Sequence, residues 1–149
     1  MVLTPNDFLG DIIRFVRDDL RTNITDPLNR AGGIEFIMTA YPKRKVQYPI
    51  VTLKITGSST QKLGMQSEVN LVNVTLEIRL WAKNAKQSDQ ITAEIIDRLR
   101  DLQYDASGTD NEEIFGFKLN SMTPVVEEIG EDNLIHSKVM EFLYSAILT

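Results

Sequence analysis

The sequence predicts a single α+β domain in which two helices cover one face of a mainly antiparallel sheet. Three observations predict this class: two segments with a one-sided apolar stripe at helical spacing, a strongly alternating segment between them, and further alternating segments after the second helix. The 149 residues, 42% of them hydrophobic, suit one domain with one core. The expected order is helix, three strands, helix, two strands.

The first predicted helix spans residues 5–22. Thr4 can cap it, Pro5 suits the first helical position, and Asp7 lies three residues after the cap, where it can return a bond to the cap. We expect the helix to end before the Asp26-Pro27 break. The residues of its apolar stripe recur at spacings of three and four, and they are Phe8, Leu9, Ile12, Ile13, Val16 and Leu20.

Three strands are predicted next. Ile34–Tyr41 reads as a short extended segment, and Tyr48–Ile55 alternates between apolar and polar residues. The strongest alternation lies in Val72–Leu80, which predicts one face in the core and one face in water. Between the last two strands, Gly57–Glu68 is polar and contains glycine. Its composition and length predict a long loop that is mobile in the isolated subunit and becomes ordered at an interface.

The second predicted helix spans Ala85–Leu102, where isoleucine and leucine recur every three or four residues. A flexible connector and two closing strands complete the order. These segments are the connector 105–111, two extended stretches over 115–119 and 124–129, the turn 130–133 and the final strand 134–148.

Composition excludes several classes of site. The chain has no cysteine, which excludes disulfides, thiolate nucleophiles, zinc–thiolate sites and iron–sulfur clusters. Its single histidine, His136, excludes multi-histidine metal sites and reads as an ordinary residue of the last strand. The net charge of −5 disfavours a general nucleic-acid binder. Without an export signal or a long apolar run, we expect a soluble protein made in a cytoplasm.

Catalytic and ligand-binding motifs are missing from the sequence. It contains no G-x-S-x-G, no P-loop and no dinucleotide-binding fingerprint. Neighbouring carboxylates such as Glu127 and Glu128 point to opposite faces of a strand, so they do not easily share a substrate. The cluster Glu127–Asp132 reads either as a solvated turn or as a weak cation site, since it lacks calcium-loop spacing. We therefore expect no enzyme, cofactor or resident metal.

One basic run and several scattered residues are candidates for interactions. Lys43, Arg44 and Lys45 lie between Tyr41 and Tyr48, and they read as a solvated loop, as a surface for an acidic partner, or as a single-strand binder that uses the aromatic rings. The other candidates for a subunit or partner interface are Leu63, Met65, Gln66, Glu77, Arg79 and Trp81.

A different observation makes each of these residues a candidate for an interface. Leu63 and Met65 are apolar residues poorly placed for the core, and methionine adapts readily to interfaces. Glu77 and Arg79 occupy the polar face of the alternating strand and are available for pairing across subunits. Trp81 reads equally well as the edge of the core or as an interface anchor.

The overall layout resembles the small tail terminator, or tail completion, proteins of long-tailed bacteriophages, which include head–tail joining proteins. The resemblance covers nearly the whole chain and concerns layout and short dipeptides. The matching parts are the helix with Ile12–Arg21, the extended segment to Tyr41-Pro42, the strand opening Tyr48–Val51, the strand 74–80 followed by Trp81-Ala82, the helix with Ile91–Leu102, and the two closing strands.

The resemblance implies a structural virion protein that forms a hexameric ring at the head-proximal end of the tail, ends tube growth and joins tail to head. The implied partners are further copies of the chain, the tail-tube protein and the head connector or stopper protein. It implies no small-molecule substrate, membrane or specific nucleic-acid binding, although DNA can pass through the ring. Assembly would occur in the host cytoplasm. Alternatives are another neck, connector or tail-tube component, a generic binding module, or an enzyme with an unrecognised site.

Overall fold

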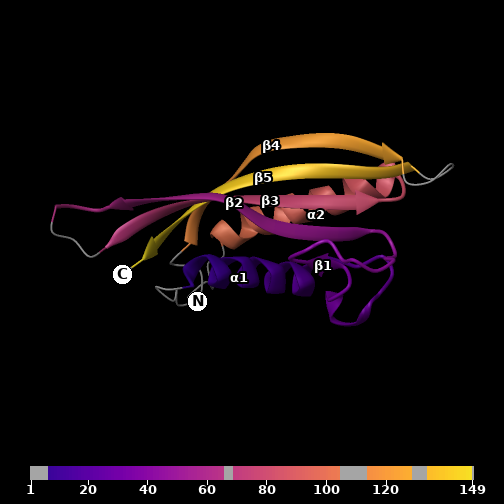
Figure 1. Cartoon of the computed structure of the whole chain (residues 1–149), viewed down its shortest axis with the longest axis horizontal. Coiled ribbons are helices and arrows are strands. Elements are labelled where there is room, and N and C mark those ends of the chain that lie inside the picture. Colours follow the sequence, from indigo (N-terminus) through magenta and orange to yellow (C-terminus); the bar gives the residue numbers. More distant parts are fainter. Residues whose placement is uncertain (1–6, 66–68, 105–113, 129–133, 149) are drawn as a thin grey trace.

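The computed structural model describes residues 7–65, 69–104, 114–128 and 134–148 (Figure 1). The element order confirms the predicted fold class. In chain order the elements are α1 (Phe8–Asn23), the short 3₁₀ turn η1 (Ala31–Gly33), β1 (Ile37–Met38), β2 (Ile50–Lys62), β3 (Asn70–Ala82), α2 (Ala85–Tyr104), β4 (Ile114–Glu128) and β5 (Leu134–Leu148).

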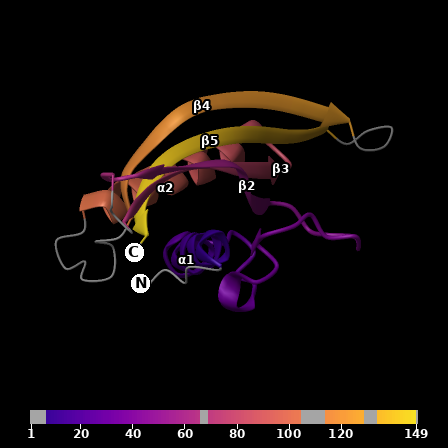
Figure 2. The ribbon, with the colours of Figure 1, turned by 60° about the vertical axis from the view of Figure 1, so that its left-hand side comes forward.

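The five described strands form one sheet in the order β1-β2-β3-β5-β4. Only the short pair of β1 and β2 is parallel, and the other three pairs are antiparallel. The sheet curves over both helices, which lie on its concave face (Figure 2). The single apolar stripe on each helix accounts for this arrangement, because each stripe can be buried only against that one face.

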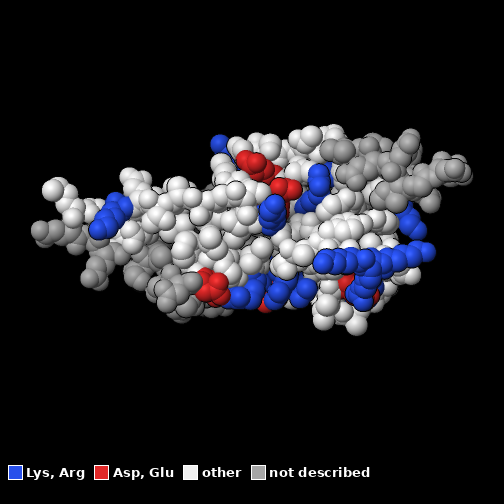
Figure 3. Space-filling view, in the orientation of Figure 1, with Lys and Arg blue, Asp and Glu red and all other residues white. Residues whose placement is uncertain are grey.

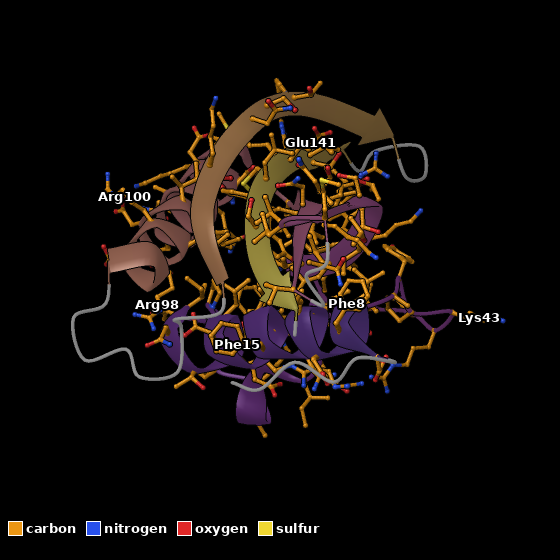
Figure 4. The ribbon with its side chains drawn as sticks, turned by 90° about the vertical axis from the view of Figure 1, so that its left-hand side faces the viewer. Phe8, Phe15, Lys43, Arg98, Arg100 and Glu141 are labelled. Atoms are coloured by element: carbon orange, nitrogen blue, oxygen red, sulfur yellow. The ribbon has the colours of Figure 1, made fainter. Side chains whose placement is uncertain are left out.

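The main core lies between the sheet and the helices. The alternating residues predicted to point one way from β3 are buried, and those of β5 that pair with them continue the same layer. Arg98 of α2, labelled in Figure 4, donates two hydrogen bonds of 2.9 and 2.8 Å to the Asp19 carboxylate of α1. Core residues on β3 and β5 are Val72, Val74, Leu76, Ile78, Leu80, Met140, Phe142, Tyr144 and Ala146, and those on the helices are Ile12, Val16, Leu20, Ile91, Ile95 and Leu99.

The prediction of a loop over Gly57–Glu68 is wrong for most of that segment. β2 continues to Lys62 and pairs with β3 up to Lys62↔Asn70, with one irregularity between Ile55 and Gly57. Residues 57–62 are polar because both faces of this part of β2 are exposed. Their strand conformation is set by backbone hydrogen bonds to β3. Mobility is therefore not expected over 57–62. Only 63–65 remain as a described turn, and 66–68 lie outside the described residues.

Other boundaries also differ from the prediction. α1 begins at Phe8, and Asp7 at its N-cap makes no side-chain capping bond but pairs with Arg14 at 2.8 Å. The predicted strand Ile34–Tyr41 is reduced to the two residues of β1, because only they run along the edge of β2. β4 is one continuous strand with two register shifts and not two stretches. Thr4, Pro5 and the predicted connector and turn at 105–111 and 130–133 lie outside the described residues.

A second, smaller core lies at one end of the sheet, on the face opposite the helices. Ile50, Trp81 and Ile135 are buried there, and Met38, Val46 and Tyr48 pack against them. Side chains alternate between the faces of a strand, so Trp81 faces away from the layer of Leu80. We call residues 39–49, which cover this second core, the strap.

Candidate functional site

The residues predicted to take part in interactions lie on three surfaces: the tip of the β2–β3 hairpin, the helix-free face of the sheet, and the strap. Within the described ranges, no group of three or more acidic or histidine side chains is arranged to hold a metal ion. Neither α1 nor α2 is long and apolar enough to cross a membrane. His136 is partly buried on β5, opposite Ala82. The side chains of Glu127–Asp132 lie outside the described part of the chain.

The hairpin tip projects beyond the helices, as the left side of Figure 1 shows. Met65 is 99% exposed and Leu63 is 44% exposed, although both are large apolar residues. The Leu63 N–H donates to the carbonyl of Val69 at 3.0 Å, so paired backbone holds the base of the turn. The tip therefore presents apolar side chains on a supported arm. Gln66 lies outside the described residues.

The helix-free face carries a polar ladder across the strands. Lys54, Glu77 and Glu141 lie in one row of the register, and Thr52, Arg79 and Val139 lie in the next row. The amide of Asn120 on β4 donates to the Glu141 carboxylate at 2.8 Å. The structure thus places Glu77 and Arg79 on one face, as their alternation predicts.

Trp81 lies where this face meets the strap. It is only 7% exposed, and the Tyr41 ring packs edge-on against it with centroids 5.0 Å apart. The Arg79 guanidinium stacks on the same indole at 5.4 Å from the ring centroid. This packing makes Trp81 part of the second core in the isolated subunit. A role as an interface anchor stays a prediction, and it would require the strap to move.

Arg30 holds the strap in place, and it was not among the residues predicted from the sequence to have a role. Its guanidinium pairs with the Asp26 carboxylate at 2.8 Å and donates to three carbonyl oxygens, those of Glu35, Gln47 and Pro49. The Arg30 and Asp26 side chains are 10% and 8% exposed. The i,i+4 spacing of Asp26 and Arg30 was the only available signal, and it is common on surfaces where no such network exists.

The Asp26 carboxylate makes the stability of the folded chain depend on pH. Burial favours a higher pKa, but hydrogen bonds from the Arg30 side chain and from the backbone N–H groups of Leu28 and Arg30 outweigh it, so the pKa of Asp26 is lowered. A lowered folded-state pKa contributes stability above the ordinary value of 3.8, and this stability is lost as pH falls through the folded-state pKa.

We expect Asp26→Asn to lower the free energy of unfolding at neutral pH, and the difference from the wild type to shrink as the pH falls below about 3.8. Urea unfolding across that range measures it. Asp97→Asn, in an exposed pair with Arg100, is the matched control and should show little difference at any pH. A constant difference between Asp26→Asn and wild type across the range would contradict this assignment.

The basic run lies on the outer surface of the strap. Arg44 forms an exposed ion pair with Glu35 at 2.8 Å, whereas Lys43 and Lys45 are exposed and form no ion pair among the described residues. Lys and Arg side chains, drawn in blue, gather at the lower right of Figure 3. Figure 4 labels Lys43 at the right-hand side of the molecule. A hollow of about 340 Å³ adjoins the run and is lined by Arg30, Glu35, Met38, Arg44, Lys45, Val46 and Gln47.

The two tyrosines beside the run are engaged with each other. Their hydroxyl groups form a hydrogen bond of 2.7 Å, and the ring of Tyr41 also packs against Trp81. A ring held in this way is a poor platform for stacking a nucleic-acid base. Of the three interpretations of the run, this geometry disfavours the single-strand binder.

Comparison with known proteins gives no family assignment. The sequence matches no known protein family, and no curated protein is significantly similar to it.

Proposed function

We propose that the chain is a structural virion protein that assembles into a ring, hexameric as the resemblance in layout implies, at the head-proximal end of a phage tail.

 The proposed ring ends growth of the tail tube and joins the tail to the head. The observation that carries the proposal is the hairpin tip, where Leu63 and Met65 are exposed on an arm that extends past the helices. The proposed form of the assembly, a ring at the end of a tail tube, comes from the resemblance in layout.

The tip has the features of an assembly contact. A large apolar side chain that is 99% exposed, as Met65 is, gains from burial against a partner. The paired backbone of β2 and β3 holds the arm in place, so less conformational entropy is lost on binding than for a free loop. The tip is thus suited to insert into a neighbouring subunit.

The free edges of the sheet offer a second and different surface. β4 lies at one end of the strand order, and β1 covers only Val51 and Thr52 on the opposite edge. A contact between the tip of one copy and another surface of the next copy is heterologous, and repeated heterologous contacts close into a ring when the rotation allows. The same surfaces also suit a different neck or tube component, which is the alternative that the experiment below separates.

We expect the double substitution Leu63→Asp and Met65→Asp to weaken self-association at least roughly 100-fold, because two charges would have to be buried without partners. Leu28→Asp is the matched control, since Leu28 is 45% exposed against 44% for Leu63 and lies before η1, outside the hairpin. Sedimentation equilibrium and electron microscopy of the purified variants measure association, and circular dichroism verifies folding.

The same substitutions in a phage that carries this gene test the role itself. Tails of abnormal length, or tails that fail to join heads, are expected with the double substitution and not with Leu28→Asp. Normal tails joined to heads would show that the tip is not an assembly contact. Tubes that fail to form at all would favour the alternative, a tube or connector component.

A further inference from the structure

A small apolar hollow lies between α2 and the margin of the sheet that β4 forms. We call it the α2–β4 hollow; its volume is about 160 Å³, and its lining consists of Ile96, Leu99, Arg100, Leu119 and Phe142. Leu99 and Phe142 are buried there, while Ile96 and Leu119 are partly exposed. Arg100, labelled in Figure 4, supplies the charge in this lining, and its guanidinium is paired with Asp97 at 2.9 Å. The hollow therefore offers a mainly apolar surface to a ligand.

The size of the α2–β4 hollow suits a single side chain. Liquid water occupies ~30 Å³ per molecule, so the 160 Å³ of the hollow holds roughly five atoms of that size. The side chains of leucine and methionine are of this size and chemistry. Pockets for small molecules usually measure ~300–1,000 Å³ and combine apolar walls with several placed polar groups. The volume and lining therefore favour one apolar side chain of a protein partner over a small molecule.

The tip of the β2–β3 hairpin carries two such side chains. Leu63 and Met65 are 44% and 99% exposed. They cannot fill the hollow of their own chain, because Phe142 of the hollow pairs with Leu76 of β3, far from the tip. Leu76 and Asn70, the first residue of β3, are six residues apart, or roughly 20 Å along the strand. A tip that fills the hollow must therefore belong to a second copy.

Charges beside the two surfaces are complementary. Lys62 lies directly before the tip, is exposed, and forms no ion pair among the described residues. Asp101 follows Arg100 on the exposed side of α2 and has no ion pair within the described part of the chain either. The lysine of an inserted tip can therefore face this carboxylate. An ion pair between exposed groups contributes little, so we expect the apolar contact to supply most of the affinity.

We propose that Leu63 and Met65 of one copy insert into the α2–β4 hollow of a second copy. This inference rests on the proposed self-assembly and identifies the surface that receives the tip. The tip extends along the strands, whereas the hollow lies at their β4 margin (Figures 1 and 4). The contact joins two different surfaces, so it is heterologous and leaves one tip and one hollow for further copies, as a ring requires.

Engineered disulfides test the contact directly, because the chain has no cysteine of its own. We expect Met65→Cys mixed with Arg100→Cys to give covalently linked pairs on mild oxidation, since a disulfide forms where Cα atoms are ~4.4–6.8 Å apart. The matched controls are Leu28→Cys in place of Met65→Cys and Lys86→Cys in place of Arg100→Cys, both at exposed positions. The controls should give at least tenfold less linked product by mass spectrometry.

The chain with both Met65→Cys and Arg100→Cys distinguishes a ring from a reciprocal pair. A ring gives linked species of increasing length up to the full number of copies. A product that stops at two chains would retain this contact and overturn the proposed ring, because each tip would then fill the hollow of the same partner.

A charge placed in the hollow tests the apolar contact without a crosslink. We expect Ile96→Asp to weaken self-association at least tenfold by sedimentation equilibrium, because its carboxylate would be buried against the inserted tip. Gln90→Asp is the matched control, as Gln90 is exposed on the same helix and does not line the hollow. Circular dichroism verifies that both variants fold.

Each other result has a definite meaning. If Leu63→Asp with Met65→Asp abolishes association but Met65→Cys and Arg100→Cys form no link, the tip binds elsewhere and only this inference falls. A folded Ile96→Asp chain that associates like the wild type also shows that the inference is wrong. A wild-type chain that never associates, alone or on tail tubes, overturns the proposed function as well.

Discussion

Replacing Arg30 with alanine is expected to lower the free energy of unfolding by about 3–5 kcal/mol, the usual cost of breaking a buried ion pair by removing one partner. The Asp26 carboxylate is 8% exposed, so without Arg30 its charge would be left largely out of water and unpaired. Three carbonyl oxygens, those of Glu35, Gln47 and Pro49, would also lose their donor. These groups belong to different parts of the segment between α1 and β2, so the loss would loosen the strap.

Urea unfolding of the purified variant measures this change. Arg100→Ala is the matched control, because Arg100 and Asp97 form an exposed pair that should contribute no more than about 1 kcal/mol. Arg30→Lys should recover little of the loss, since an ammonium group cannot supply the several planar donors that reach Asp26 and the three carbonyls. A loss from Arg30→Ala as small as that from Arg100→Ala would show that the network does not hold the strap in place.

Periodicity predicted the elements whose conformation depends on one buried face. The stripe of α1 and the alternation of β3 each follow from burial on one side, and the structure has both elements within a few residues of the expected bounds. The extension of β2 to Lys62 could not be predicted in the same way. Its residues 57–62 are exposed on both faces, so their strand conformation depends on pairing with β3, a contact distant in sequence.

The candidate surfaces were predictable in part. Exposure of Leu63 and Met65 follows from their place in a polar segment between two strands. The strap was not predictable, because no periodicity marks a segment held by Arg30 and by aromatic packing from Trp81. Sequence alone placed Tyr41 and Tyr48 near the basic run, but their mutual hydrogen bond depends on how the strap folds back.

Trp81 gives the other large expected effect. Trp81→Ala should lower the free energy of unfolding by about 3–5 kcal/mol, as removal of a buried large aromatic ring usually does. The indole is 7% exposed and contacts both Tyr41 and Arg79, so its loss would leave a cavity under the strap. Hydrogen exchange should also rise at the Val51 N–H, which donates to the Phe36 carbonyl at 2.7 Å beside β1.

A conservative change separates the two roles considered for Trp81. Trp81→Phe keeps most of the apolar volume, and we expect it to cost no more than about 1.5 kcal/mol of unfolding free energy. Because Trp81 lies under Tyr41 in the isolated subunit, self-association of Trp81→Phe should equal that of the wild type by sedimentation equilibrium. A folded Trp81→Phe chain that associates at least tenfold more weakly would contradict the core assignment. That outcome would mean that the strap opens on assembly and that the indole then contacts the neighbouring subunit, since only a partner contact would make association sensitive to this change.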